Sequence, residues 1–265
     1  MKIKNALATL PLTLNACGGD VEIGGIQTPN EPGFGIWEGA ISASLINTTT
    51  SSSGAVSTIE PTSATGVGLY TSNNTAFFFK EDTQTLFTRG SPVVSAGVLY
   101  STPYTYENGV DTGRVNFNSG DVYTSASLKG TYSAVTLGSI SGNYALIFNN
   151  KYYHGAELSR LSGDWLYTDN NSNVWQLTIQ PGGGFTGSST IVNNCSIING
   201  IFSTIDPDKN EYAMDLELTS CGIYDGVYKG IAATIDTNNE DDSLLLAIYT
   251  LNNSNAFFMK PLKQP

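Results

Sequence analysis

The chain has 265 residues, of which 23 are Asp or Glu and 12 are Lys or Arg, so its formal net charge at pH 7 is −11. This acidity argues against nucleic acid as a partner, because such binding depends on Lys and Arg side chains that neutralise phosphates. Hydrophobic residues make up 40% of the chain, with 14 Tyr and 11 Phe, which argues against a disordered chain.

Residues 1–16 are typical of a secretory signal peptide. Lys2 and Lys4 precede an apolar stretch of about ten residues that ends in small residues. The stretch is too short to cross a bilayer, which needs about 20 apolar residues. We therefore expect an exported chain without a transmembrane helix.

The end of this signal, Leu14-Asn15-Ala16-Cys17, resembles the lipobox of bacterial lipoproteins. The resemblance implies that Cys17 carries diacylglycerol, including chains such as palmitate, and that the signal is cut just before it. Such acyl chains would anchor the protein in a membrane. Ordinary secretion, with cleavage after Ala16 and a free thiol, is the alternative. Gly18, in place of aspartate, implies sorting to the outer membrane in the best-studied enteric bacteria.

Residues 17–33 are rich in Gly, Pro and polar residues, which predicts a flexible tether between lipid and folded body. After it, runs of five to eight β-branched and aromatic residues alternate with Gly, Asn, Asp and Ser turns. Only residues 155–165 favour a short helix. We predict an all-β fold of two small antiparallel β-barrel or sandwich units: an N-terminal β-domain over 34–157 and a C-terminal β-barrel-like domain over 158–265.

Two pairs of similar segments indicate that the two β units are related in structure. Gly35-Ile36-Trp37 and Gly163-Asp164-Trp165 each open one half, and both tryptophans are expected in the core. The segments LYTSNNTAFFFK (69–80) and IYTLNNSNAFFMK (248–260) also read as similar hairpins. The two offsets differ, so the sequence does not predict a simple tandem repeat.

The segment from Cys195 to Cys221 predicts a hairpin closed around Asp208. This register places Cys195 opposite Cys221, and also Ile198 opposite Leu218, Phe202 opposite Met214 and Thr204 opposite Tyr212. Opposed Cβ atoms lie about 4.5–5.5 Å apart, near the distance that a disulfide requires. In an oxidising compartment we expect a Cys195–Cys221 bond. Two free buried thiols or a metal site are the alternatives, and no other ligands support the metal.

Candidate catalytic and metal sites are weak. His154 is the one histidine and has no recognisable nucleophile or orienting partner, so we assign no catalytic residue. Asp206, Asp208, Asn210 and Glu217 match EF-hand spacing, but Glu211 occupies the position that requires glycine. We therefore expect no metal site and no cofactor.

The aromatic segment 100–109 offers a candidate binding loop. Tyr100, Tyr104 and Tyr106 are possible ligand-contacting residues, because tyrosine is enriched at interfaces. The alternative is that these tyrosines complete the rim of a β-barrel.

Most of the chain after residue 16 resembles a group of uncharacterised Gram-negative outer-membrane lipoproteins. The motifs that carry this resemblance are the lipobox, the Gly-x-Trp strand, Cys195, Cys221, Asn210-Glu211-Tyr212 and Tyr228-Lys229-Gly230-Ile231-Ala232. This resemblance implies no particular activity. In size and all-β composition the chain is also similar to surface lipoproteins that bind host proteins, which is a fold-level analogy.

We therefore expect a non-enzymatic binding or adhesion lipoprotein of the cell envelope, held to the outer membrane by its acyl anchor. Its ligand would be a protein or a small molecule, and the sequence identifies neither. The alternative is a structural or accessory envelope factor that faces the periplasm. An unrecognised hydrolase is a third, weaker hypothesis.

Overall fold

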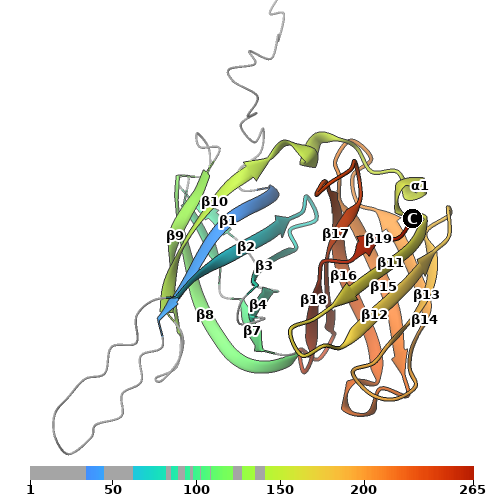
Figure 1. The fold of residues 1–265 in the computed structure, drawn as a ribbon. Helices are drawn as coiled ribbons and strands as arrows, with labels where there is room; N and C mark the ends of the chain where they lie inside the picture. Colours follow the sequence, from blue (N-terminus) through green and yellow to red (C-terminus); the bar gives the residue numbers. More distant parts are fainter. Residues whose placement is uncertain are drawn as a thin grey trace, which may run out of the picture.

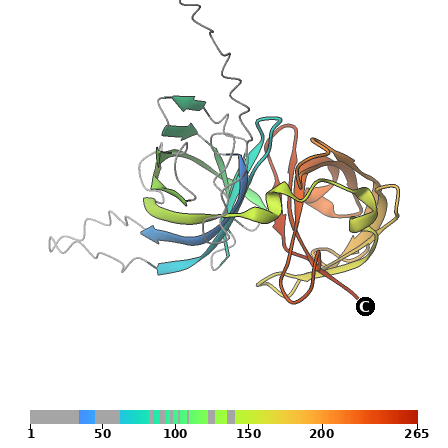
Figure 2. The same ribbon diagram turned by 90° about the horizontal axis from the view of Figure 1, so that it is seen from above.

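The fold consists of two antiparallel sheets formed by successive parts of the chain, side by side in Figures 1 and 2. The computed structural model describes residues 34–44, 62–81, 85–88, 93–95, 98–101, 103–107, 109–121, 127–134 and 141–265. The expectation of an all-β chain with two β units is confirmed. None of the helices in this part of the chain has the length and hydropathy needed to span a membrane.

The N-terminal sheet contains β1 to β10. Its strands are β1 (Gly35–Ser44), β2 (Thr62–Tyr70), β3 (Ala76–Lys80), β4 (Thr85–Thr88), β5 (Val93–Ser95), β6 (Val98–Ser101), β7 (Tyr104–Glu107), β8 (Val110–Asp121), β9 (Ser127–Ala134) and β10 (Ser141–Asn149). β1 pairs with β10 as well as with β2, and β8 pairs with β9 as well as with β7. The sheet therefore curves until its ends meet.

The C-terminal sheet forms a barrel from β11 to β19. Its strands are β11 (Gly163–Thr168), β12 (Val174–Ile179), β13 (Gly184–Ser189), β14 (Cys195–Thr204), β15 (Tyr212–Thr219), β16 (Gly226–Ile235), β17 (Ser243–Thr250), β18 (Ala256–Met259) and β19 (Leu262–Lys263). β19 lies between β17 and β11 and closes the ring. The helical turns are η1 (Asn150–Tyr153), α1 (Leu158–Leu161) and η2 (Gly222–Tyr224), and α1 lies in the segment that the sequence favoured for a short helix.

Strands β16 and β17 are apolar on both faces because both faces are covered. The inner face, with Leu244, Leu246 and Ile248, belongs to the core of the barrel. The outer face, with Ile231 and Leu245, belongs to a second core that also contains residues of the N-terminal sheet. The strands of Figure 1 that separate the two units thus serve both cores. A strand buried on two sides reads as a continuous apolar run, as SLLLAI does.

The two similar hairpins of the sequence have related turns, the second one residue longer, and pack against each other. Thr71 N–H donates to the Thr75 carbonyl and Thr250 N–H to the Asn255 carbonyl, each at 2.9 Å. In both turns an asparagine has positive φ: Asn74 at 64° and Asn253 at 61°. Phe79 of β3 then stacks on Phe258 of β18 with ring centroids 3.9 Å apart. The resemblance between these segments therefore marks the contact between the two units.

Trp37 and Trp165 are buried, as expected for core residues. Trp37 contacts Phe148 edge-on, with ring centroids 5.5 Å apart. Trp165 donates from its indole nitrogen to the Leu161 carbonyl at 2.7 Å, which fixes α1 against the end of the barrel. Each tryptophan therefore anchors the first strand of its sheet.

The predicted register of the β14–β15 hairpin is correct near the turn and wrong beyond it. Phe202 pairs with Met214, as expected, but Leu218 pairs with Ile197 rather than with Ile198. A bulge between Ile198 and Ile201 shifts the ladder by one residue, and Asn199 takes φ of 52° there. Ile197 is consequently buried, at 2% exposure.

The second bulge residue, Gly200, explains why the bulge lies at this place. A Cβ atom at this position would lie 2.6 Å from the Phe185 ring. Only glycine lets β14 pass so close to β13, and the shifted ladder then turns Ile197 into the barrel.

Candidate functional site: a groove at the barrel seam

A cavity lies where the wall of the C-terminal barrel splits. β18 and β19 both run antiparallel to β17, with Met259 opposite Leu246 and Leu262 opposite Ser243. β19 also pairs with β11, where Leu262 faces Leu166. Beyond Leu166 the strand continues to Thr168, but within the described residues it has no partner on this edge. A groove of about 530 Å³ lies in this gap.

Both units contribute to the groove. Phe79 and Glu81 come from the N-terminal unit, and the barrel supplies Leu166, Tyr167, Thr168, Asn170, Phe258, Lys260, Leu262 and Gln264. The stacked Phe79–Phe258 pair forms an apolar contact between the units at this place. A smaller cavity of about 100 Å³ shares Phe79, Tyr167 and Phe258 with the groove and reaches Trp175 and Phe257 of the barrel core.

Charged and polar groups cross the groove. Lys260 Nζ lies 3.6 Å from Glu81 Oε1, and both side chains are about one-third exposed (29% and 36%). The side-chain amide of Asn170 donates to the Glu81 carbonyl at 3.2 Å. An aromatic surface with a few convergent polar groups is typical of ligand sites.

A buried carboxylate joins the two units at a second place, away from the groove. Glu211 is fully buried, and its carboxylate accepts from Ser72 N–H at 2.9 Å and from the Ser72 hydroxyl. The Tyr152 hydroxyl donates to the same carboxylate at 3.0 Å. Glu211 occupies the position where a calcium loop would need glycine, and its role here is an inter-unit contact.

Lys151 forms ion pairs with acids of the turn 236–242. Its ammonium group, only 4% exposed, lies 2.9 Å from an Asp236 oxygen and 3.1 Å from an Asp241 oxygen. Burial lowers the pKa of Lys151, but the hydrogen bonds and charges of these aspartates outweigh burial and raise it. Burial raises the pKa of Asp241, but the nearby Thr234 hydroxyl and the Lys151 ammonium group outweigh burial and lower it. The acids are therefore held by an internal cation.

In the part of the chain that the structure describes, no group of three or more His, Cys, Asp or Glu residues could hold a metal ion. Asn210, one of the EF-hand positions, is instead buried and accepts a hydrogen bond from Thr234 N–H at 2.9 Å. His154 caps η1, where its N–H donates to the Lys151 carbonyl at 3.1 Å.

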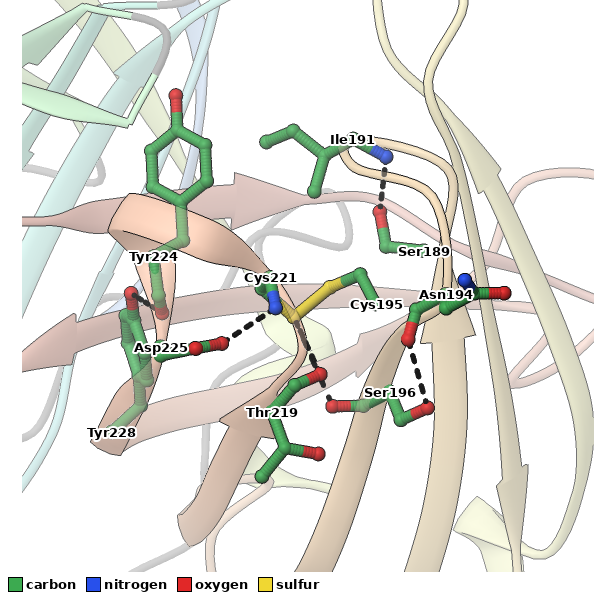
Figure 3. Close-up of a disulfide and its surroundings, with 10 residues drawn as sticks. All are labelled: Ser189, Ile191, Asn194, Cys195, Ser196, Thr219, Cys221, Tyr224, Asp225 and Tyr228. Atoms are coloured by element: carbon green, nitrogen blue, oxygen red, sulfur yellow. Dashed lines mark hydrogen bonds between the residues drawn. A yellow bond between two sulfur atoms is a disulfide. The ribbon is translucent and has the colours of Figure 1, made fainter.

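The cysteines expected to pair are bonded. Cys195 and Cys221 form a disulfide with Cα atoms 4.4 Å apart, drawn in Figure 3. Cys221 lies just beyond the end of β15, and its N–H donates to Asp225 Oδ1 at 2.5 Å. The bond therefore closes the β14–β15 hairpin at the end away from its turn. Cys17 and the tether 17–33 lie outside the described residues.

The three tyrosines of the candidate loop do not form one exposed site. Tyr106 is fully buried, and its hydroxyl donates to the Asn253 carbonyl of the C-terminal unit at 3.2 Å. Tyr104 is half-buried beneath the guanidinium of Arg114, which lies 4.1 Å from its ring centroid. Tyr100 lies in β6, and its side chain is outside the described part. The expectation of an exposed aromatic loop is thus wrong for Tyr106, since its position on β7 points the side chain into the core.

Sequence reasoning missed the groove, although two signals lay near it. The similar hairpins contain Phe79, Phe258 and Lys260. Pro261 follows β18 and cannot donate a hydrogen bond to β17, which marks the break before β19. Neither signal reveals that β11 and β18 separate.

Comparison of the chain with protein-family models, curated proteins and solved structures found no match. The fold alone defines its class, which is an all-β chain of two antiparallel units.

Proposed function

We propose that this chain is a lipid-anchored outer-membrane protein of a Gram-negative envelope that binds a partner without catalysis. The groove between β11 and β18 is the observation that carries the binding role. Its residues come from both units, and the stacked Phe79–Phe258 pair joins the units at the groove. Ligand sites are usually largely preformed clefts of this size, so a ligand could bind here without a large conformational change.

The membrane part of the proposal rests on the lipobox at Cys17 and on the residues before it. The acidic net charge of −11 gives the protein no electrostatic attraction to an anionic lipid surface. An acyl chain on Cys17 would supply the attachment. Protease treatment of intact cells then separates a surface-exposed binding protein, which is cleaved, from an accessory factor facing the periplasm, which is protected.

The binding role is tested with a variant that fills the groove. Leu166→Trp adds bulk at the groove wall, and Ile147→Trp adds the same bulk at an exposed site of the N-terminal sheet, where the side chain is 56% exposed. Purified protein carrying Cys17→Ser is used to capture partners from envelope extracts and host fluids. A species retained by the parent and by Ile147→Trp, but not by Leu166→Trp, supports the groove. Equal capture by all three proteins would rule it out.

A further inference from the structure

We infer that the groove takes an extended peptide segment, which pairs as an added strand with the free edges of β11 and β18. This inference rests on the proposed binding function and specifies the partner class. It starts from the direction of the main-chain groups on the two walls, since residues of one strand point their N–H and C=O groups alternately to opposite edges.

The β11 wall offers Thr168. The Asp164 carbonyl accepts from Gln264 N–H at 2.8 Å, so the even-numbered residues of β11 point their main-chain groups toward β19. Leu166, opposite Leu262, follows the same direction. Thr168 is the next such residue, and it lies where the pairing with β19 has already ended.

The β18 wall offers Phe258 and Lys260. Leu244 N–H donates to the Pro261 carbonyl at 3.0 Å and Lys263 N–H donates to the Asp242 carbonyl at 2.9 Å, so odd-numbered residues here point toward β17. The main-chain groups of Phe258 and Lys260 therefore point away from β17. Ala256 points the same way, and its N–H donates to the Gly109 carbonyl at 3.1 Å, beyond the groove.

The two walls face each other without pairing. If the β11–β19 register continued, Lys260 would lie opposite Thr168, but no strand pairing joins these residues within the described ranges. Both residues and Phe258 line the groove of about 530 Å³. A sheet edge with donors and acceptors at every second residue is a template for another strand.

This chemistry favours a polypeptide. On the β18 wall the main-chain groups of Phe258 and Lys260 recur at about 6.8 Å, twice the rise per residue, and match the backbone of an extended peptide. Thr168 presents the corresponding groups of one residue on the β11 wall. The aromatic surface of Phe79 and Tyr167 would contact apolar side chains, and the Glu81–Lys260 pair would contact polar ones. β19 already pairs with the first part of β11. The added strand would pair with the next part of β11 and with β18, so that the hydrogen-bond ladder continues.

The probe is a seven-residue peptide selected from a displayed random library against the purified protein carrying Cys17→Ser. Thr168→Pro removes the N–H that points into the groove and breaks no bond to β12, since the main-chain groups of Thr168 point to the other edge of β11. Thr168→Ala retains the N–H and is the matched control. We expect Thr168→Pro to bind about tenfold more weakly than Thr168→Ala, and N-methylation of alternate peptide residues to weaken binding to the parent by a similar factor. The amides of Thr168 and Phe258 should exchange rapidly in the free protein and slowly with peptide bound.

The outcomes distinguish the groove as the binding site from strand pairing as the mode of binding. Binding lost in Leu166→Trp but unaffected by Thr168→Pro and by N-methylation overturns strand pairing and leaves a groove that recognises side chains. Binding that survives Leu166→Trp overturns the groove as the site. Selection that yields no peptide, or slow exchange of both amides in the free protein, overturns the peptide inference, since slow exchange means that the edges are already paired.

Discussion

Glu211 accepts hydrogen bonds from the N–H and the hydroxyl of Ser72, a residue 139 positions earlier in the chain. The contact joins the turn after β2 to the strand β15 that begins at the next residue, Tyr212. Since Glu211 is fully buried, its carboxylate depends on these donors and on Tyr152 in place of water.

Glu211→Gln should destabilise the protein by about 1.5–3 kcal/mol, because an amide presents donors where Ser72 and Tyr152 also donate. Glu217→Gln, on the same hairpin, is the control. Glu217 accepts from the Asn199 amide in an exposed contact, so its change should stay within about 0.5 kcal/mol. Denaturant unfolding measures both. Equal effects would show that the inter-unit contact contributes nothing specific.

Loss of the disulfide should lower stability by about 2–4 kcal/mol, the usual range for a native bond. The cross-link restricts the unfolded chain across a separation of 26 residues. Non-reducing peptide mapping should recover one fragment that contains both Cys195 and Cys221. The paired change Cys195→Ser with Cys221→Ser should then show a lower melting temperature, and an unchanged one would contradict this account.

Ile197→Ala should cost about 2–5 kcal/mol, as truncation of a buried isoleucine does. Ile198→Ala should cost less than half as much, because the bulge turns Ile198 away from the fully buried set. Thermal unfolding of the two variants compares neighbouring residues with the same side chain. If Ile198→Ala lost more stability than Ile197→Ala, the regular register predicted from the sequence would be correct instead.

Stability should decline as the pH rises from 10 toward 12. Burial raises the pKa of Tyr70 from 10.0 to about 12 and that of Tyr212 from 10.0 to about 12. The folded state therefore binds these protons more tightly than the unfolded state, so their contribution is complete below pH 10 and lost as pH approaches 12. Denaturant unfolding at several pH values measures the slope. Tyr70→Phe should make the slope shallower, and an unchanged slope would remove Tyr70 as a cause.

Cys17 should carry the lipid. Radiolabelled palmitate should label the parent protein and not Cys17→Ser, which should fractionate with soluble proteins. Cys195→Ser is a control that keeps the lipobox and should still be labelled. Equal labelling of the parent and Cys17→Ser would end the lipoprotein proposal.

The sequence predicts strands and hairpins well in this chain because alternation and turn residues are local properties. Residues 212–219 alternate between core and surface, so their faces and the disulfide follow from the pattern. The bulge does not follow, because Ile197 and Ile198 are both apolar and either could face inward. Gly200 decides the matter through its contact with Phe185 on another strand.

The groove and the burial of Tyr106 depend on contacts between distant segments. Tyr104 and Tyr106 lie two apart on β7 and share a face of the strand, yet only Tyr106 meets Asn253 of the other unit. Which of them is covered depends on where the second unit lies. The splitting of β11 from β18 depends in the same way on the residue at which pairing with β19 ends.

The position of β18 and β19 also constrains the order of folding. The outer core of the N-terminal sheet includes Phe258, and the ring of the barrel closes only through β19. A chain emerging from a ribosome or a translocation channel cannot complete either core until residues 256–263 have emerged. The contacts of these two strands therefore form late in synthesis, and both cores keep apolar surface exposed until then.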